Sequence, residues 1–167
     1  MRIYVVRHSH PADADYDEDG DPDLDEEGVE IASALGAWMV EHEEIPTVIY
    51  ASPMTRTTRT AELLRDAIAE GGFAAPEIVP DAGIGPHMSI KGLLEKVAAD
   101  EASSRVAVVS HHESIEHGLR VLNEDPTVHH DVFAEGELRI LRVKRKNAKW
   151  EERKRVAPSD LGLYDNY

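Results

Sequence analysis

The chain has 167 residues, no cysteine and a formal net charge of −15 at pH 7. The lack of cysteine excludes disulfides, thiolate catalysis and thiolate zinc sites, and the acidic charge argues against nonspecific binding to nucleic acid or to an anionic membrane. No apolar stretch approaches the roughly 18 residues that span a bilayer, and no signal-type segment precedes the first apolar run. We therefore expect one cytoplasmic domain over residues 1–167, and the sequence indicates no particular oligomeric state.

Apolar runs alternate with amphipathic segments along most of the chain, which is typical of a parallel sheet covered by helices. Ser52 is placed as the N-cap of the second predicted helix and Pro53 as its first residue. In chain order the pattern predicts a strand at 3–6, a helix at 26–42, a strand at 48–51, a helix from 53 to the Gly71-Gly72 pair, a short strand at 77–79, a helix at 89–99, a strand at 105–109 and a helix at 113–122.

The pattern changes after residue 122. Leu138–Val143 and Trp150–Val156 are predicted to form a hairpin that turns at Lys146-Asn147-Ala148, while residues 158–167 show no clear pattern. The expected fold class is therefore α/β. It is a three-layer sandwich with a mostly parallel central sheet flanked by helices, and the C-terminal hairpin adds an antiparallel edge.

Cationic or imidazole side chains follow three of the predicted strands. Arg7 and His8 follow the first, Arg56 lies shortly after the second, and His111 follows the strand at 105–109. Ligand sites of open α/β sheets gather beyond the carboxyl ends of the strands, so these four side chains are predicted to share one crevice. Two guanidinium groups and two imidazoles in one place indicate an anionic ligand, and a phosphoryl group fits them best.

Phosphoryl transfer mainly requires positioning and charge stabilisation. His8 would attack phosphorus as a neutral imidazole, whose unperturbed pKa is about 6.5, with a backbone carbonyl holding its other ring nitrogen in one tautomer. Arg7 and Arg56 would bind the phosphoryl oxygens, and His111 is expected to add a third cationic donor. Water would then hydrolyse the phosphohistidine without a metal or a cofactor.

Four motifs, in this order and spacing, resemble the histidine phosphatase (phosphoglycerate-mutase-like) superfamily, and the short chain is most similar to its phosphohistidine phosphatases. The resemblance implies that His8 is the phosphorylated nucleophile, that Arg7 and Arg56 bind the phosphate, and that His111 is the second pocket histidine. It implies a phosphatase whose substrate is a phosphorylated protein or a small phosphorylated compound. The motifs are Arg7-His8-Ser9, Leu24-Asp25-Glu26-Glu27-Gly28, Ser52-Pro53-Met54-Thr55-Arg56 with Thr60-Ala61, and Val109-Ser110-His111.

The sequence departs from the family pattern in three places. Larger members carry an acidic proton donor after the third strand, but the loop at 80–87 has no carboxylate at the expected position: Asp81 lies too early, and His87 is only a candidate. A phosphoramidate leaves more readily than an alkoxide, so the missing acid favours phosphohistidine or another labile phosphoryl compound as substrate. Ser9 and His112 stand where glycine is common, and Ser9 could restrict φ or crowd the phosphate.

Other functions remain open. A phosphatase or mutase acting on small phosphomonoesters, and a noncatalytic protein that binds phosphorylated ligands, both fit the same motifs. Asp15–Glu26 matches a twelve-residue calcium loop, although a strand rather than a helix precedes it and Pro22 occupies the usual apolar position. His129-His130 is interpreted as a solvated loop, because no third metal ligand is placed by spacing.

Overall fold

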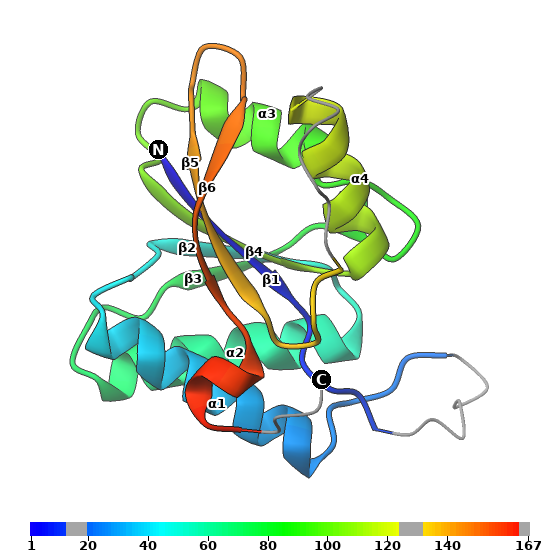
Figure 1. The fold of residues 1–167 in the computed structure, drawn as a ribbon, viewed down its shortest axis with the longest axis vertical. Helices are drawn as coiled ribbons and strands as arrows, with labels where there is room; N and C mark the ends of the chain where they lie inside the picture. The colour runs from blue at the N-terminus through cyan, green and yellow to red at the C-terminus, as the bar shows by residue number, and fades with distance from the viewer. Residues whose placement is uncertain (13–19, 124–131, 164–167) are drawn as a thin grey trace.

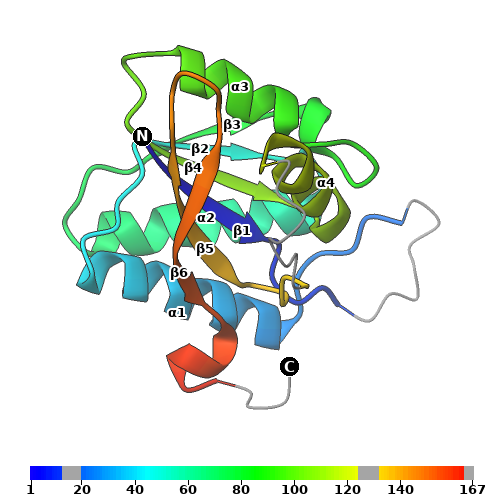
Figure 2. The ribbon, with the colours of Figure 1, turned by 45° about the horizontal axis from the view of Figure 1, so that its top comes forward.

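The computed structural model describes residues 1–12, 20–123 and 132–163. They form a six-stranded sheet in the order β3-β2-β4-β1-β5-β6, with helices on both faces (Figures 1 and 2). The elements are β1 (Arg2–Arg7), α1 (Glu26–Glu41), β2 (Val48–Ala51), α2 (Thr55–Glu70), β3 (Glu77–Pro80), the 3₁₀ helix η1 (Ala82–Ile84), α3 (Lys91–Ala99), β4 (Arg105–Ser110), α4 (His112–Asn123), β5 (Leu138–Val143), β6 (Trp150–Val156) and the 3₁₀ helix η2 (Pro158–Leu161).

The sheet is parallel from β3 to β1 and antiparallel at its C-terminal edge. β2 pairs with β3 and β4, and β4 pairs with β1, all in parallel. β5 runs antiparallel to β1 and carries β6 as the outer strand of the hairpin. The predicted α/β class, mostly parallel sheet and antiparallel hairpin edge are therefore confirmed.

The continuous apolar runs of β1 and β4 are explained by burial on both faces of the sheet. Ile3 and Val5 belong to the core under α3 and α4, whereas Tyr4 and Val6 belong to the core over α1 and α2. All four side chains are fully buried. Successive side chains of a strand point to opposite faces, so only a sheet with helices on both sides can bury such a run completely.

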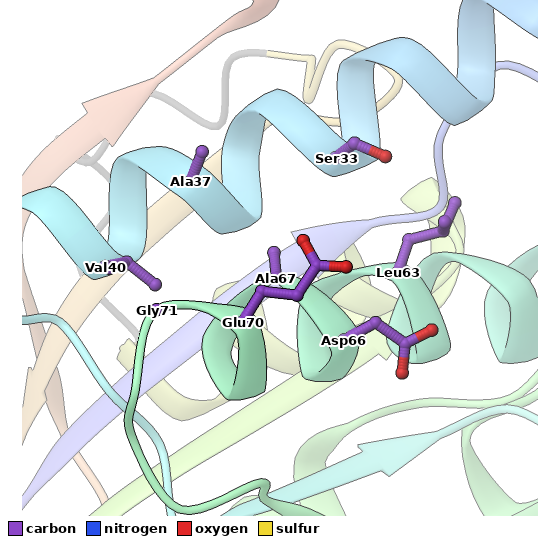
Figure 3. A pocket seen from close by; sticks show the side chains of 8 residues that line it. All are labelled: Ser33, Ala37, Val40, Leu63, Asp66, Ala67, Glu70 and Gly71. Atoms are coloured by element: carbon purple, nitrogen blue, oxygen red, sulfur yellow. The ribbon is translucent and has the colours of Figure 1, made fainter.

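Small residues let α1 and α2 approach each other closely. A Cβ added at Gly36 would lie 2.6 Å from the Cβ of Ala67, and one added at Gly71 would lie 2.5 Å from a methyl group of Val40. Figure 3 shows the open hollow of about 430 Å³ beside this crossing, which is lined by small, apolar and acidic side chains. Arg7, His8, Arg56 and His111 do not line it.

Two local predictions are wrong. Ser52 is not an N-cap and Pro53 is not helical: α2 begins at Thr55, and its N-cap residue makes no side-chain cap hydrogen bond. Instead the carboxylate of Asp21 accepts hydrogen bonds from the backbone N–H and the hydroxyl of Thr55, each at 2.7 Å. A capping residue that lies far away in the sequence cannot be recognised from the residues around the start of the helix. The sequence pattern therefore predicted the nearby Ser52 as the cap.

The remaining differences are small. The helix predicted at 89–99 begins at Lys91, and α4 begins one residue earlier and ends one residue later than predicted. Part of the tail forms η2, whose Leu161 packs against the core formed by the sheet with α1 and α2. Residues 15–19 of the possible calcium loop and His129-His130 lie outside the described residues. Among the helices described, none is long and apolar enough to cross a membrane.

Candidate active site

The register of the sheet brings the ends of β1, β2 and β4 to one place. Arg7 pairs with Ser110 across β1 and β4, and Ala51 pairs with Val109 across β2 and β4. The chain then leaves each strand toward the same crevice, with the backbone N–H of His8 donating to the carbonyl of Ser110 at 3.0 Å. The site residues are therefore positioned by strands that end level with one another.

The structure brings the four residues named from the sequence together. The ring centroids of His8 and His111 are 5.4 Å apart, and Arg56 Nη2 lies 3.2 Å from His111 Nδ1. Arg7 pairs with Ser110 across β1 and β4, and these two residues directly precede His8 and His111 in the chain. The charge of Arg7 helps to lower the pKa of both histidines. The predicted convergence of two guanidinium groups and two imidazoles is thus observed.

His8 is held in one tautomer. Its Nδ1 lies 2.8 Å from the backbone carbonyl oxygen of Ser9, which can only accept, so Nδ1 carries the proton and Nε2 keeps its lone pair. Burial, followed by the charges of Arg56 and Arg7, lowers the pKa of His8 to about 4, although the Ser9 carbonyl opposes this shift. The expected backbone contact is confirmed, and the ring is neutral near pH 7.

His111 is also neutral, which corrects the prediction of a third cationic donor. Arg56 can only donate, so His111 Nδ1 accepts from it, and Nε2 then carries the proton and donates to Ser52 Oγ at 2.9 Å. Burial and the neighbouring charges, Arg56 first, lower the pKa of His111 to about 3. Its two hydrogen bonds fix both the ring and the guanidinium of Arg56.

Both arginines carry buried N–H groups that lack an acceptor within the described residues. Arg7 donates to the Phe133 carbonyl at 2.7 Å and to Glu135 at 3.4 Å, but its Nε has no partner. Nη1 of Arg56 has none either, with a carboxylate oxygen of Asp21 4.0 Å away. A buried unpaired donor costs about 1–3 kcal/mol, and more when charged, so this pair favours an anion that supplies acceptors.

Ser9 neither strains the backbone nor crowds the site, contrary to expectation. Its φ is not positive, and its fully buried hydroxyl donates to the carbonyl of Gly28 at 2.7 Å. Its backbone N–H donates to Thr60 Oγ1 at 3.0 Å. A Cβ on Gly28 would lie 2.1 Å from the carbonyl oxygen of His10, so the first turn of α1 packs directly on the loop that carries His8.

The other polar residues considered from the sequence lie at the rim or serve local structure. His112 Nε2 lies 3.4 Å from a carboxylate oxygen of Glu116 in its own helix. Asp81 accepts from the backbone N–H of Gly83 and so caps η1. The ring of His87 is 91% exposed and lies 3.5 Å from Glu113.

Three residues that contact the site were missed from the sequence. Ser52 holds His111, Thr60 holds the backbone of Ser9 and of Arg56, and Glu135 contacts Arg7. Ser52 and Thr60 belong to the motifs quoted above, and their place in those motifs is the sequence signal for their contacts with the site. Glu135 follows a segment without regular periodicity, and only the fold reveals its contact.

Comparison with known proteins agrees with this geometry. Residues 3–78, a little under half of the chain, match the model of the histidine phosphatase superfamily (branch 1). The sequence matches none of the curated proteins.

Solved structures of similar fold cover nearly the whole chain. The protein histidine phosphatase SixA complexed with tungstate is 17% identical with a TM-score of 0.82, over 96% of this chain and 99% of that one. The putative phosphohistidine phosphatase SixA from Agrobacterium tumefaciens is 22% identical, with a TM-score of 0.75 over 94% and 98% of the two chains. A mycobacterial glucosyl-3-phosphoglycerate phosphatase complexed with VO3 is 15% identical, with a TM-score of 0.67 over 90% and 96%.

Proposed function

We propose that this chain is a metal-independent phosphatase that works through a phosphohistidine intermediate on His8. Its substrate is phosphohistidine in proteins or another labile phosphoryl compound. One observation supports this most strongly: the neutral imidazole of His8, with its Nε2 lone pair available, lies beside two guanidinium groups. Their buried Arg7 Nε and Arg56 Nη1 have no acceptor among the residues that the structure describes. A nucleophile and donors for an oxyanion thus occur in one buried place.

In the first step His8 Nε2 attacks phosphorus, and the bond from phosphorus to the leaving group breaks. The three equatorial oxygens gather charge, which Arg7 and Arg56 stabilise. His8 gains a positive charge as it is phosphorylated, and the carbonyl of Ser9 stabilises that charge through Nδ1–H. His111 acts through Arg56, because it accepts from that guanidinium and is itself held by Ser52.

In the second step water attacks phosphorus and releases His8. The same two guanidinium groups stabilise the same oxygens, so no further charged group is required for this step. When the bond from phosphorus to Nε2 breaks, its electron pair stays on Nε2 and His8 becomes neutral again. The protein favours this neutral form, because burial and the two arginines lower the pKa of His8. Dephosphorylation is therefore favoured by the environment that keeps His8 nucleophilic.

Leaving-group chemistry supports the substrate class. Asp81 is engaged with the backbone of Gly83, and His87 is largely exposed, so neither is fixed as a proton donor. A nitrogen leaving group needs less help from an acid than an alkoxide does. The similarity to a structure described as a protein histidine phosphatase complexed with tungstate supports the same proposal, because tungstate resembles phosphate in shape and charge.

The test is hydrolysis of a phosphohistidine peptide in the presence of a metal chelator, by the parent, His8→Ala and His42→Ala. His42 caps the C-terminus of α1, where its Nδ1 donates to the Trp38 carbonyl and its ring stacks on the indole, so it serves as the matched control. We expect turnover by the parent and by His42→Ala, and none by His8→Ala. Phosphate binding without turnover in the parent would replace this proposal with a noncatalytic binding role. Equal turnover by His8→Ala would remove His8 as the nucleophile.

A further inference from the structure

A hollow beside the candidate active site is lined by both apolar and charged groups. It measures about 350 Å³ and is lined by Arg7, His10, Val132, Phe133, Ala134 and Glu135. Arg7 is shared between this hollow and the site around His8, so a group bound in the hollow would be attached to, or adjacent to, a phosphoryl group held by Arg7. The hollow therefore borders the place where a leaving group would lie.

The wall of the hollow is held by a ring contact and by backbone hydrogen bonds. The guanidinium of Arg139 stacks on the ring of Phe133 at 3.7 Å. The backbone N–H of Ala134 donates to Glu137 at 2.8 Å, and Gly136 N–H donates to the carbonyls of Arg7 and His8. The turn that carries Glu135 is thus fixed directly to the backbone of the two residues that form the site.

Glu135 places a carboxylate at the edge of this hollow. Its Oε1 accepts a long hydrogen bond of 3.4 Å from Arg7, while Oε2 has no hydrogen-bond partner in the part of the chain that is described. His10 Nε2 lies 4.0 Å from Oε2, and Nδ1 of the same ring bonds to Asp25 at 2.7 Å. Oε2 is buried, so the capacity of Glu135 to accept a further hydrogen bond from a ligand lies with Oε1, whose bond to Arg7 is long.

We propose that this hollow is a leaving-group subsite for a cationic imidazole ring, and that the Glu135 carboxylate binds the ring N–H that is not attached to phosphorus. The inference rests on the proposed function. A phosphorylated imidazole that is protonated on its second nitrogen is a zwitterion, with an anionic phosphoryl group next to a cationic ring. Arg7 and Arg56 match its anionic part, and Glu135 with the apolar wall of Val132 and Phe133 matches its flat cationic part.

This subsite explains how the reaction proceeds without a donated proton. The bond from His8 Nε2 to phosphorus forms, the bond from phosphorus to the substrate nitrogen breaks, and the electron pair of that bond returns to the substrate nitrogen. The second nitrogen already carries its proton, so the ring leaves as neutral imidazole. A carboxylate that favours the protonated ring therefore replaces the general acid that an alkoxide would need.

The same charges select against other substrates. An anionic leaving group, such as a phosphorylated carboxylic acid, would be repelled by Glu135. An aryl ester such as p-nitrophenyl phosphate leaves as a phenolate, so it gains nothing from this carboxylate, which opposes the negative charge that develops on the leaving oxygen. Glu135 thus acts on specificity through its charge, whereas a role limited to orienting Arg7 would affect every phosphorylated substrate equally.

The experiment compares Glu135→Gln with the parent on a 3-phosphohistidine peptide and on p-nitrophenyl phosphate. Glutamine has the same shape as glutamate, and the side chain is 31% exposed, so folding is preserved. Glu113→Gln is the matched control, since that carboxylate is 72% exposed and pairs with His87 at the rim. We expect Glu135→Gln to lower kcat/KM roughly tenfold or more for the peptide, as for a lost hydrogen bond to a charged group, and not to lower it for the ester. Glu113→Gln should change neither.

Equal losses of kcat/KM on both substrates would show that Glu135 only orients Arg7. No loss on either substrate would show that Glu135 takes no part in the reaction. Either result would overturn the inference. If the parent hydrolyses neither substrate, the proposed function fails, and the subsite is then tested by titrating the protein with imidazole at pH 6 in the presence of phosphate. The inference requires imidazole to bind the parent roughly tenfold more tightly than Glu135→Gln, and equal affinities would overturn it.

Discussion

Lowering the pH from 7 to 5 should destabilise this protein through its two buried site histidines. Burial and the nearby guanidinium groups lower the pKa of His8 to about 4 and that of His111 to about 3, and the two residues are only 6% and 4% exposed. Unfolded histidine titrates near 6.5, so the unfolded chain binds more protons throughout this interval. The stability contributed by each neutral ring is complete above about pH 6.5 and is lost as the pH falls toward the folded pKa. Each histidine therefore contributes a loss of about 2 kcal/mol between pH 7 and pH 5.

The assay is urea unfolding at pH 7 and pH 5, in buffer without phosphate or vanadate, for the parent and for His111→Asn. His10 acts in the opposite direction, because its bond to Asp25 raises its pKa and adds stability at acidic pH. That contribution is common to both proteins and cancels in the comparison. We expect the free energy of unfolding to fall by about 2 kcal/mol less in His111→Asn than in the parent. An equal fall in the two proteins would refute the assignment of a neutral, buried His111.

Three substitutions test other parts of the account. Arg56→Ala should lower kcat/KM by about 10²- to 10³-fold, as for the loss of an oxyanion donor, while the exposed Arg59→Ala should leave it unchanged; activity within twofold of the parent would remove Arg56 from the site. Ser9→Ala should cost about 1 kcal/mol of stability in urea unfolding but keep activity within twofold, and a large loss of kcat would mean that the hydroxyl contacts the substrate. Gly28→Ala should destabilise the protein by about 1–3 kcal/mol, because its Cβ meets the carbonyl oxygen of His10, and unchanged stability would contradict that close packing.

The sequence predicted the features that depend on local periodicity and on strand order. The apolar runs of β1 and β4 required burial on both faces, and this requirement alone indicated a sheet between two helical layers. The convergence of Arg7, His8, Arg56 and His111 followed from the same reasoning, because parallel strands deliver their ends to one edge.

Features that depend on burial and on distant contacts could not be predicted. His111 was expected to carry a charge, yet its environment, which includes Arg56, lowers its pKa to about 3. Serine is a common N-cap residue, but Ser52 accepts a hydrogen bond from His111 instead. Asp21, from another loop, caps α2. Glu135 reaches Arg7 from a turn 128 positions away in the chain, and no sequence pattern relates the two.

The central claim, that His8 is the nucleophile, is tested most directly by trapping the phosphorylated form of His8, which is labile in acid. The protein is mixed with a phosphohistidine peptide, quenched in base within milliseconds, and digested, and the phosphorylated fragment is identified by mass spectrometry. The account predicts a transient, base-stable phosphoryl group on His8 that forms and decays at rates compatible with turnover and is absent in His8→Ala. Turnover without any phosphorylated His8, or a phosphoryl group on another residue, would contradict it.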